Sequence, residues 1–100
     1  MEIKELYLKN YLGQEVKING WIRSHRKQAH FGFIDLFDGT CFQSIQIVYD
    51  EDLSNFEEVS KLLVGSSICV SGIVVESMGK QAFEIKATEI SILEIGRAHV

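Results

Sequence analysis

In residues 16–34, VKINGWIRSHRKQAHFGFI, the spacing of apolar residues becomes that of a β-strand, and this change decides the fold. Apolar Val16, Ile18 and Ile22 alternate with polar or charged neighbours, which is the period of a half-buried β-strand. Gly20 interrupts the run, at a position where a strand can bend or form a bulge. We therefore predict a long first strand in this stretch.

The same stretch concentrates positive charge in an acidic protein. It holds four of the ten Lys and Arg residues and none of the fourteen Asp and Glu residues; the four are Lys17, Arg23, Arg26 and Lys27. The overall charge of −4 argues against an indiscriminate nucleic-acid binder. A local basic strand with aromatic neighbours, in contrast, attracts a phosphate backbone at one place. The pattern favours binding of single-stranded nucleic acid.

The predicted elements on either side complete a small all-β domain. They are a short helix over residues 3–12, strands over 31–37 and 42–49 joined by a turn at 38–40, a helix of about ten residues after a capping box at Ser54 and Glu57, and strands over 66–77 and 82–94. This order predicts a five-stranded oligonucleotide-binding (OB) Greek-key barrel with a helix between strands three and four. In such barrels strands two and three hold the ligand.

Phe33 and Gln46 are predicted on the exposed surface of those two strands. Side chains alternate between the faces of a strand, so Ile34 and Leu36 on the buried face leave Phe33 on the other one. By the same parity Gln46, which lies between two isoleucines, points away from the core. We therefore expect the ring and the amide to share one sheet surface.

An exposed ring and an amide are suited to an unpaired base. A ring offers a stacking platform worth roughly 1–3 kcal/mol per base, and an amide both donates to and accepts from a base edge. Arg26 and Lys27 would meet phosphate groups, and Arg23 is a further candidate for contact with the nucleic acid. The alternative interpretation is a ring covered by the rest of the protein beside a solvated basic strand. Trp21 is expected to have a packing role, and His25 to be a loop or edge residue.

No catalytic centre, cofactor site or metal site is predicted. Cys41 and Cys69 lack the CxxC spacing of a zinc site and are expected to be reduced thiols. The sequence shows no Ser/His/Asp or Cys/His arrangement and no Gly-rich phosphate loop. Its apolar runs are far shorter than the roughly 20 residues that cross a bilayer, and no signal peptide is recognisable. We therefore expect a cytoplasmic protein without a membrane partner.

Six short motifs follow one another along the chain: GWIRSHR at 20–26, FIDL at 33–36, DGTCF at 38–42, IQ at 45–46, GIV at 72–74 and FEIKAT at 83–88. In order and spacing they resemble the N-terminal anticodon-binding domain of asparaginyl-tRNA synthetases. The resemblance covers about residues 3–94. It implies that Phe33 stacks on the central uridine of the anticodon, that Gln46 hydrogen-bonds to that base and that Arg26 assists from the first strand.

The resemblance also implies a larger parent enzyme, an ATP-dependent asparagine–tRNA ligase. Its class II catalytic domain would bind ATP, Mg²⁺ and asparagine, and such parents are usually dimers. The catalytic motifs are missing, so the chain alone is not expected to aminoacylate tRNA. Residues 1–95 are expected to form the anticodon-binding domain, and residues 96–100 a tail foreign to the family.

Three other functions stay open at this point. The first is a sequence-tolerant single-stranded nucleic-acid-binding module, and the second is the same domain of an aspartyl-tRNA synthetase that charges both tRNAs, because aspartate and asparagine anticodons share their first two letters. The third is a protein-interaction barrel, which the clustered positive charge makes the weakest.

Overall fold

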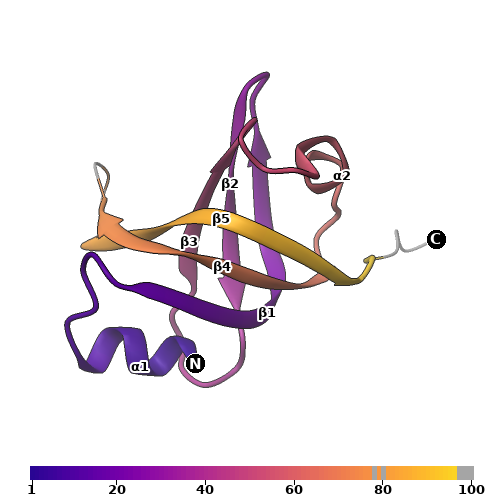
Figure 1. Cartoon of the computed structure of the whole chain (residues 1–100). Coiled ribbons are helices and arrows are strands. Elements are labelled where there is room, and N and C mark those ends of the chain that lie inside the picture. Colours follow the sequence, from indigo (N-terminus) through magenta and orange to yellow (C-terminus); the bar gives the residue numbers. More distant parts are fainter. Residues whose placement is uncertain (78, 80, 97–100) are drawn as a thin grey trace.

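The described part of the chain forms a five-stranded closed barrel with two short helices (Figure 1). The computed structural model describes residues 1–77, 79 and 81–96. The elements are α1 (Ile3–Leu8), β1 (Glu15–Lys27), β2 (Phe31–Phe37), β3 (Ile45–Asp50), α2 (Phe56–Ser60), β4 (Ser67–Glu76) and β5 (Phe83–Glu94). The strand order around the barrel is β1-β2-β3-β5-β4, in which only the described pairing of β3 with β5 is parallel.

This architecture confirms the predicted all-β barrel with a helix between the third and fourth strands. Four residues of the predicted tail, 97–100, lie outside the described residues. Neither helix in the described part of the chain has the length and apolar character that crossing a membrane requires.

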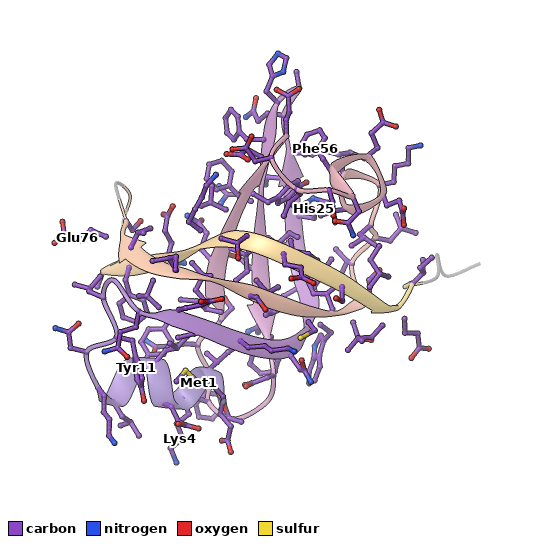
Figure 2. All side chains as sticks on the ribbon, viewed as in Figure 1. Met1, Lys4, Tyr11, His25, Phe56 and Glu76 are labelled. Carbon is purple, nitrogen blue, oxygen red and sulfur yellow. The ribbon has the colours of Figure 1, made fainter. Side chains whose placement is uncertain are left out.

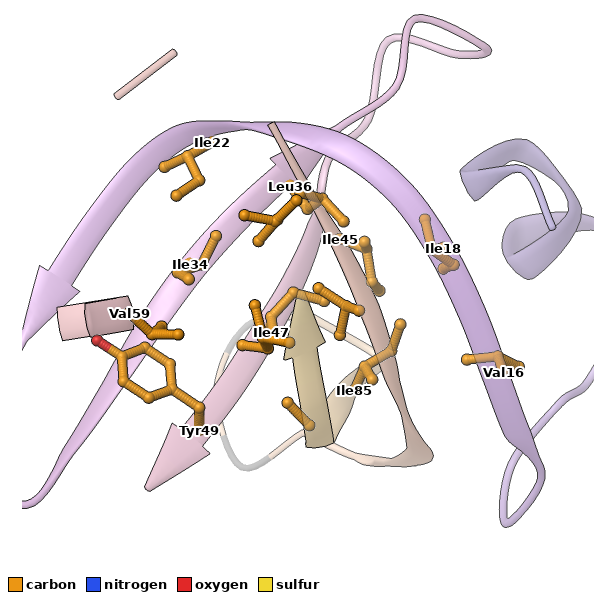
Figure 3. Packing of buried hydrophobic residues seen from close by; sticks show 14 of the residues in the cluster. Val16, Ile18, Ile22, Ile34, Leu36, Ile45, Ile47, Tyr49, Val59 and Ile85 are labelled. Atoms are coloured by element: carbon orange, nitrogen blue, oxygen red, sulfur yellow. The ribbon is translucent and has the colours of Figure 1, made fainter. Parts of the chain in front are cut away.

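The barrel interior is filled by branched aliphatic side chains from alternate positions of the strands. Figure 3 shows Ile18 and Ile22 on β1, which arches over the core, with Ile34 of β2, Ile47 of β3 and Ile85 of β5 beneath it. All of these side chains are fully buried. Burial of apolar surface is the main favourable term in folding, so this alternation fixes which face of each strand is left for binding.

A bulge in β1 decides which of its side chains share the outer face. The pairing with β2 skips Arg23, which is the extra residue of the bulge. Before it, odd-numbered Trp21 pairs with Phe37 on the outer face, whereas beyond it even-numbered Arg26 pairs with Phe33. Without the bulge, Arg26 would point toward the interior.

Sequence reasoning predicted the bend or bulge of the first strand at Gly20, whereas the bulge lies three residues later, at Arg23. This glycine instead lets β1 pass close to the end of β2. A Cβ atom at this position would lie 2.8 Å from the carbonyl oxygen of Phe37 and 2.9 Å from the Leu36 side chain. Contacts this short force a shift of backbone, so the bend of β1 depends on glycine here.

The connection between β2 and β3 is longer than the predicted turn, because β3 begins at Ile45 rather than at residue 42. Asp38 organises it. One carboxylate oxygen accepts from the backbone N–H of Ile3 (2.8 Å), and the other accepts from the backbone and hydroxyl of Thr40 (3.0 and 2.6 Å). Burial alone would raise the pKa of Asp38, but these hydrogen bonds outweigh it and lower the pKa. Asp38 thus ties α1 to the barrel.

The helix α2 is also shorter than predicted. Its N-cap is Asn55 rather than Ser54, and the Asn55 amide donates to the backbone of β5 (2.9 Å) instead of closing a capping box. Val59 is buried, as its helical spacing indicated, but Leu63 lies beyond the helix and is 49% exposed. The predicted capping box and helix length were therefore wrong.

His25 has a structural role that sequence reasoning missed. Its Nδ1 donates to the carbonyl oxygen of Leu62 (2.9 Å), and its Nε2 is hydrogen-bonded to the Tyr49 hydroxyl (2.6 Å). The rings of His25 and Phe56, both labelled in Figure 2, each lie 5.8 Å from the Tyr49 ring between centroids. Burial raises the pKa of Tyr49 to about 12. This chain of hydrogen bonds joins β1, β3 and the segment after α2.

Candidate nucleic-acid interface

The outer face of β2 is unusually aromatic. Its four outward positions are Phe31, Phe33, Asp35 and Phe37. Solvent-facing strand positions are normally polar, because only the other face is packed on the core. Phe31 nevertheless exposes 39% of its surface and meets Phe33 edge to face, with 5.5 Å between ring centroids. Apolar rings at these positions indicate a contact surface.

A groove of about 1020 Å³ lies against this face. Arg26 of β1, Phe33 of β2 and Gln46 of β3 line it, together with Glu84 of β5. The structure thus brings three sequence-predicted site residues into one hollow. The parity argument for Phe33 and Gln46 is confirmed, since both occupy outward positions on adjacent strands.

The Gln46 amide is held from both sides. Its Oε1 accepts from Nη2 of Arg26 (2.9 Å), and its Nε2 donates to Oε1 of Glu84 (3.1 Å). A guanidinium only donates and a carboxylate only accepts, so these partners fix which end of the amide is oxygen. Each end retains further capacity, one lone pair on the oxygen and one N–H on the nitrogen. The amide therefore presents an acceptor and a donor in a defined order.

Arg26 also lies over the Phe33 ring, with Cζ 5.1 Å from the ring centroid. This distance is within the range of a cation–π contact. One arginine thereby contacts both the stacking ring and the amide.

The other two predicted residues are not part of this cluster. Arg23 lies over the ring of Phe37, 4.6 Å from its centroid, toward the opposite end of β2. Lys27 is paired with Gly32 at the end of β1, where the parity of the strand directs it away from the aromatic face. Sequence reasoning grouped Arg23 and Lys27 with Arg26 because they are close along the chain. The bulge in β1 separates their side chains from that of Arg26.

Sequence reasoning missed Glu84 and Asp35. Glu84 reaches Gln46 because β3 and β5 pair in parallel, with Ile47 opposite Ile85. Asp35 lies on the same outer face of β2, and its carboxylate accepts a hydrogen bond from the Ser24 hydroxyl (2.7 Å). The FEIKAT motif contained Glu84 but gave no information about its partner.

An ion pair lies next to these residues along β3 and β5. The Nζ of Lys86 donates to Asp50, and this hydrogen bond, with that from the backbone of Asp52, lowers the pKa of Asp50. No cluster of His, Cys, Asp or Glu suited to a metal ion occurs among the described residues.

The family profile for OB-fold nucleic-acid-binding domains matches residues 16–93. This chain belongs to that family. The match spans all five strands, including those that line the groove. It agrees with the charge pattern and with the aromatic outer face.

Curated relatives of this OB-fold chain are asparagine–tRNA ligases. That of Desulfitobacterium hafniense is 50% identical over 93 residues, and that of Alkaliphilus metalliredigens is 47% identical over 95 residues. These matches cover 90% and 92% of the chain but 20% of each relative, so the chain spans about a fifth of their length. The resemblance to asparaginyl-tRNA synthetases is thereby confirmed.

Solved structures share the fold at lower identity. Asparaginyl-tRNA synthetase from Pyrococcus horikoshii superimposes with a TM-score of 0.83 at 22% identity, covering 96% of this chain and 22% of that one. An OBody bound to hen egg-white lysozyme gives 0.71 at 24% identity, covering 85% of this chain and 84% of that one. At these identities the likeness shows the barrel and no binding partner.

Proposed function

We propose that this chain is the anticodon-binding domain of an asparagine–tRNA ligase, comprising residues 1–95, and that its groove reads the central uridine of the anticodon. The observation that supports this most is the Gln46 amide, held in one orientation by Arg26 and Glu84 beside the Phe33 ring. The relatives support the ligase, and the geometry supports the choice of base.

The held amide is complementary to uridine. The pairing edge of uridine offers an N3–H donor next to a carbonyl acceptor, which match the free lone pair and the free N–H of Gln46. Cytidine presents the reverse order, an acceptor at N3 and an amino donor. To pair with cytidine, the amide would have to flip, which would turn its NH₂ toward Arg26 and its oxygen toward the Glu84 carboxylate. Both contacts are repulsive, so cytidine is disfavoured.

Phe33 would supply affinity and Gln46 selectivity. Stacking on an aromatic ring is insensitive to base identity and contributes about 1–3 kcal/mol. As the base stacks, the exposed Arg26 guanidinium would slide off the ring but keep its Nη2 hydrogen bond to Gln46, because its other N–H donors are free to meet a phosphate. The basic run around β1 would then hold the backbone of the loop.

The activity of the whole ligase is part of the same proposal. The chain contributes tRNA binding, whereas ATP and Mg²⁺ would act in the parts of the enzyme outside it. We propose that the ligase works in the cytoplasm as a homodimer.

The test compares anticodon stem-loops that differ only in the central base. Fluorescence anisotropy should show tighter binding with uridine than with cytidine or guanosine. Phe33→Ala should weaken binding to all of them by roughly five- to 150-fold, the equivalent of one stacked base. Phe42→Ala is the matched control, because Phe42 is 99% exposed between β2 and β3 and outside the groove.

Equal affinity for all central bases would contradict the proposed reading of uridine. Equal affinity together with a steep salt dependence would instead favour the sequence-tolerant binding module. A ligase for both asparagine and aspartate tRNAs would give the same preference for uridine, so the third anticodon base distinguishes that case.

A further inference from the structure

The outer face of β1 and β2 carries the same arrangement twice. At one end Arg26 lies over Phe33, and at the other end Arg23 lies over Phe37, with Cζ 4.6 Å from the ring centroid. In each case an arginine of β1 covers a phenylalanine of β2. The proposed reading of the central base uses only the first of these pairs.

The second pair is extended by a large aromatic side chain. Trp21 meets Phe37 edge to face, with 5.4 Å between ring centroids and 74° between planes. It retains 43% of its surface exposed. Its ring also passes near Gly39, where an added Cβ atom would lie 3.6 Å from it. The indole is thus supported on one side and open on another, as a stacking platform requires.

The bulge gives this platform its charge. Arg23 is the extra residue, so it makes no pairing contact with β2 and is aimed by the bulge over Phe37. It is exposed and forms no ion pair among the described residues. A guanidinium over one ring of an aromatic pair combines the two features that single-stranded RNA binds, a cation for phosphate and an apolar face for a base.

We propose that Trp21, Phe37 and Arg23 form a second nucleotide site, which binds a base and phosphate of the anticodon loop other than the central nucleotide. Phe33 and Phe37 are four residues apart on one strand, about 13 Å at the rise of a β-strand. This distance far exceeds the roughly 3.4 Å between stacked neighbouring bases, so the two platforms take different nucleotides. Between them Asp35 repels phosphate, which directs the backbone to the arginines on either side. The site rests on the proposed function and adds affinity without selecting the central base.

Trp21 reports on this site directly, because it is the only tryptophan in the chain. Titration of the wild-type chain with the uridine stem-loop should quench tryptophan emission. The quenching should saturate at the RNA concentration that saturates the anisotropy of a labelled stem-loop. Arg23→Gln should weaken stem-loop binding several-fold and reduce the slope of log affinity against log salt by about 0.7, the loss of one phosphate contact on a single strand.

Phe37→Leu keeps an apolar side chain at the site and should weaken binding by about fivefold or more, because it removes the stacking surface. Neither variant should change the ratio of affinities for uridine and cytidine. Lys9→Gln, at the end of α1, is the control for the change of charge.

Two results would overturn the second site. One is saturable binding of RNA with no change in tryptophan emission. The other is an Arg23→Gln variant whose affinity and salt slope equal those of Lys9→Gln. A stem-loop that fails to bind the wild-type chain at all would contradict the proposed function instead, so the two failures are distinguishable.

Discussion

Glu84→Gln should relax the choice between uridine and cytidine while leaving the stacking contact in place. The Glu84 carboxylate accepts from Nε2 of Gln46 at 3.1 Å and can only accept, whereas a glutamine at 84 can accept or donate. A flipped Gln46 amide would then find a partner on that side. Hydrogen bonds to charged groups contribute about 1.5–3 kcal/mol and neutral ones about 0.5–1.5. The preference of the Gln46 amide for its uridine-pairing orientation therefore falls by about 1 kcal/mol. This corresponds to a roughly fivefold smaller ratio of the affinities for uridine and cytidine.

The assay is the ratio of dissociation constants for uridine and cytidine stem-loops. Removing a carboxylate also raises affinity for any RNA, but this effect cancels in the ratio. Glu89→Gln is the matched control, because Glu89 is an exposed carboxylate of the same strand outside the groove. An unchanged ratio in Glu84→Gln, or the same change in both variants, would refute the proposed lock on the amide.

Two further side chains, Tyr49 and Asp38, give predictions about the stability of the fold and its dependence on pH. Tyr49→Phe loses the hydrogen bond to His25 and should lower the free energy of unfolding by about 1 kcal/mol in urea denaturation. Because the folded pKa of Tyr49 is raised to about 12, the wild-type stabilisation should be complete below about pH 10 and fall as pH rises toward 12, and a flat profile there would contradict this. Asp38→Ala frees the N–H of Ile3 and the Thr40 side chain and should cost about 2 kcal/mol. The folded pKa of Asp38 is lowered, so its contribution should be complete above about pH 4 and decrease as pH falls through the folded pKa; acid unfolding that is the same with and without Asp38 would argue against it.

Strand periodicity predicted the part of the interface that depends on local sequence. Alternation predicted that Phe33 lies on the outer face of its strand, away from the buried Ile34, and that Gln46 points outward between two isoleucines. The structure agrees on both. The order of elements, together with the placement of the polar residues, predicted the barrel, because it matches a Greek key in which a helix connects the third and fourth strands.

The remaining features depend on contacts between distant segments. Nothing local marks Arg23 as the bulged residue, because the bulge follows from how β1 must pair with β4 and β2 at once. Glu84 reaches Gln46 only through the parallel pairing of β3 and β5. The length of α2 was overestimated because apolar residues keep a helical spacing through Leu63, whereas the helix ends at Ser60 and the chain then turns to pair with β1.

The most direct test of the uridine-reading groove is an NMR titration with anticodon trinucleotides that differ only in the central base. With a central uridine, the account predicts that the side-chain NH₂ signals of Gln46 and the ring signals of Phe33 shift together and saturate. With a central cytidine, the Phe33 signals should shift and those of Gln46 should move much less. Binding that saturates while both residues stay unperturbed, or that moves Gln46 equally for both bases, would contradict it.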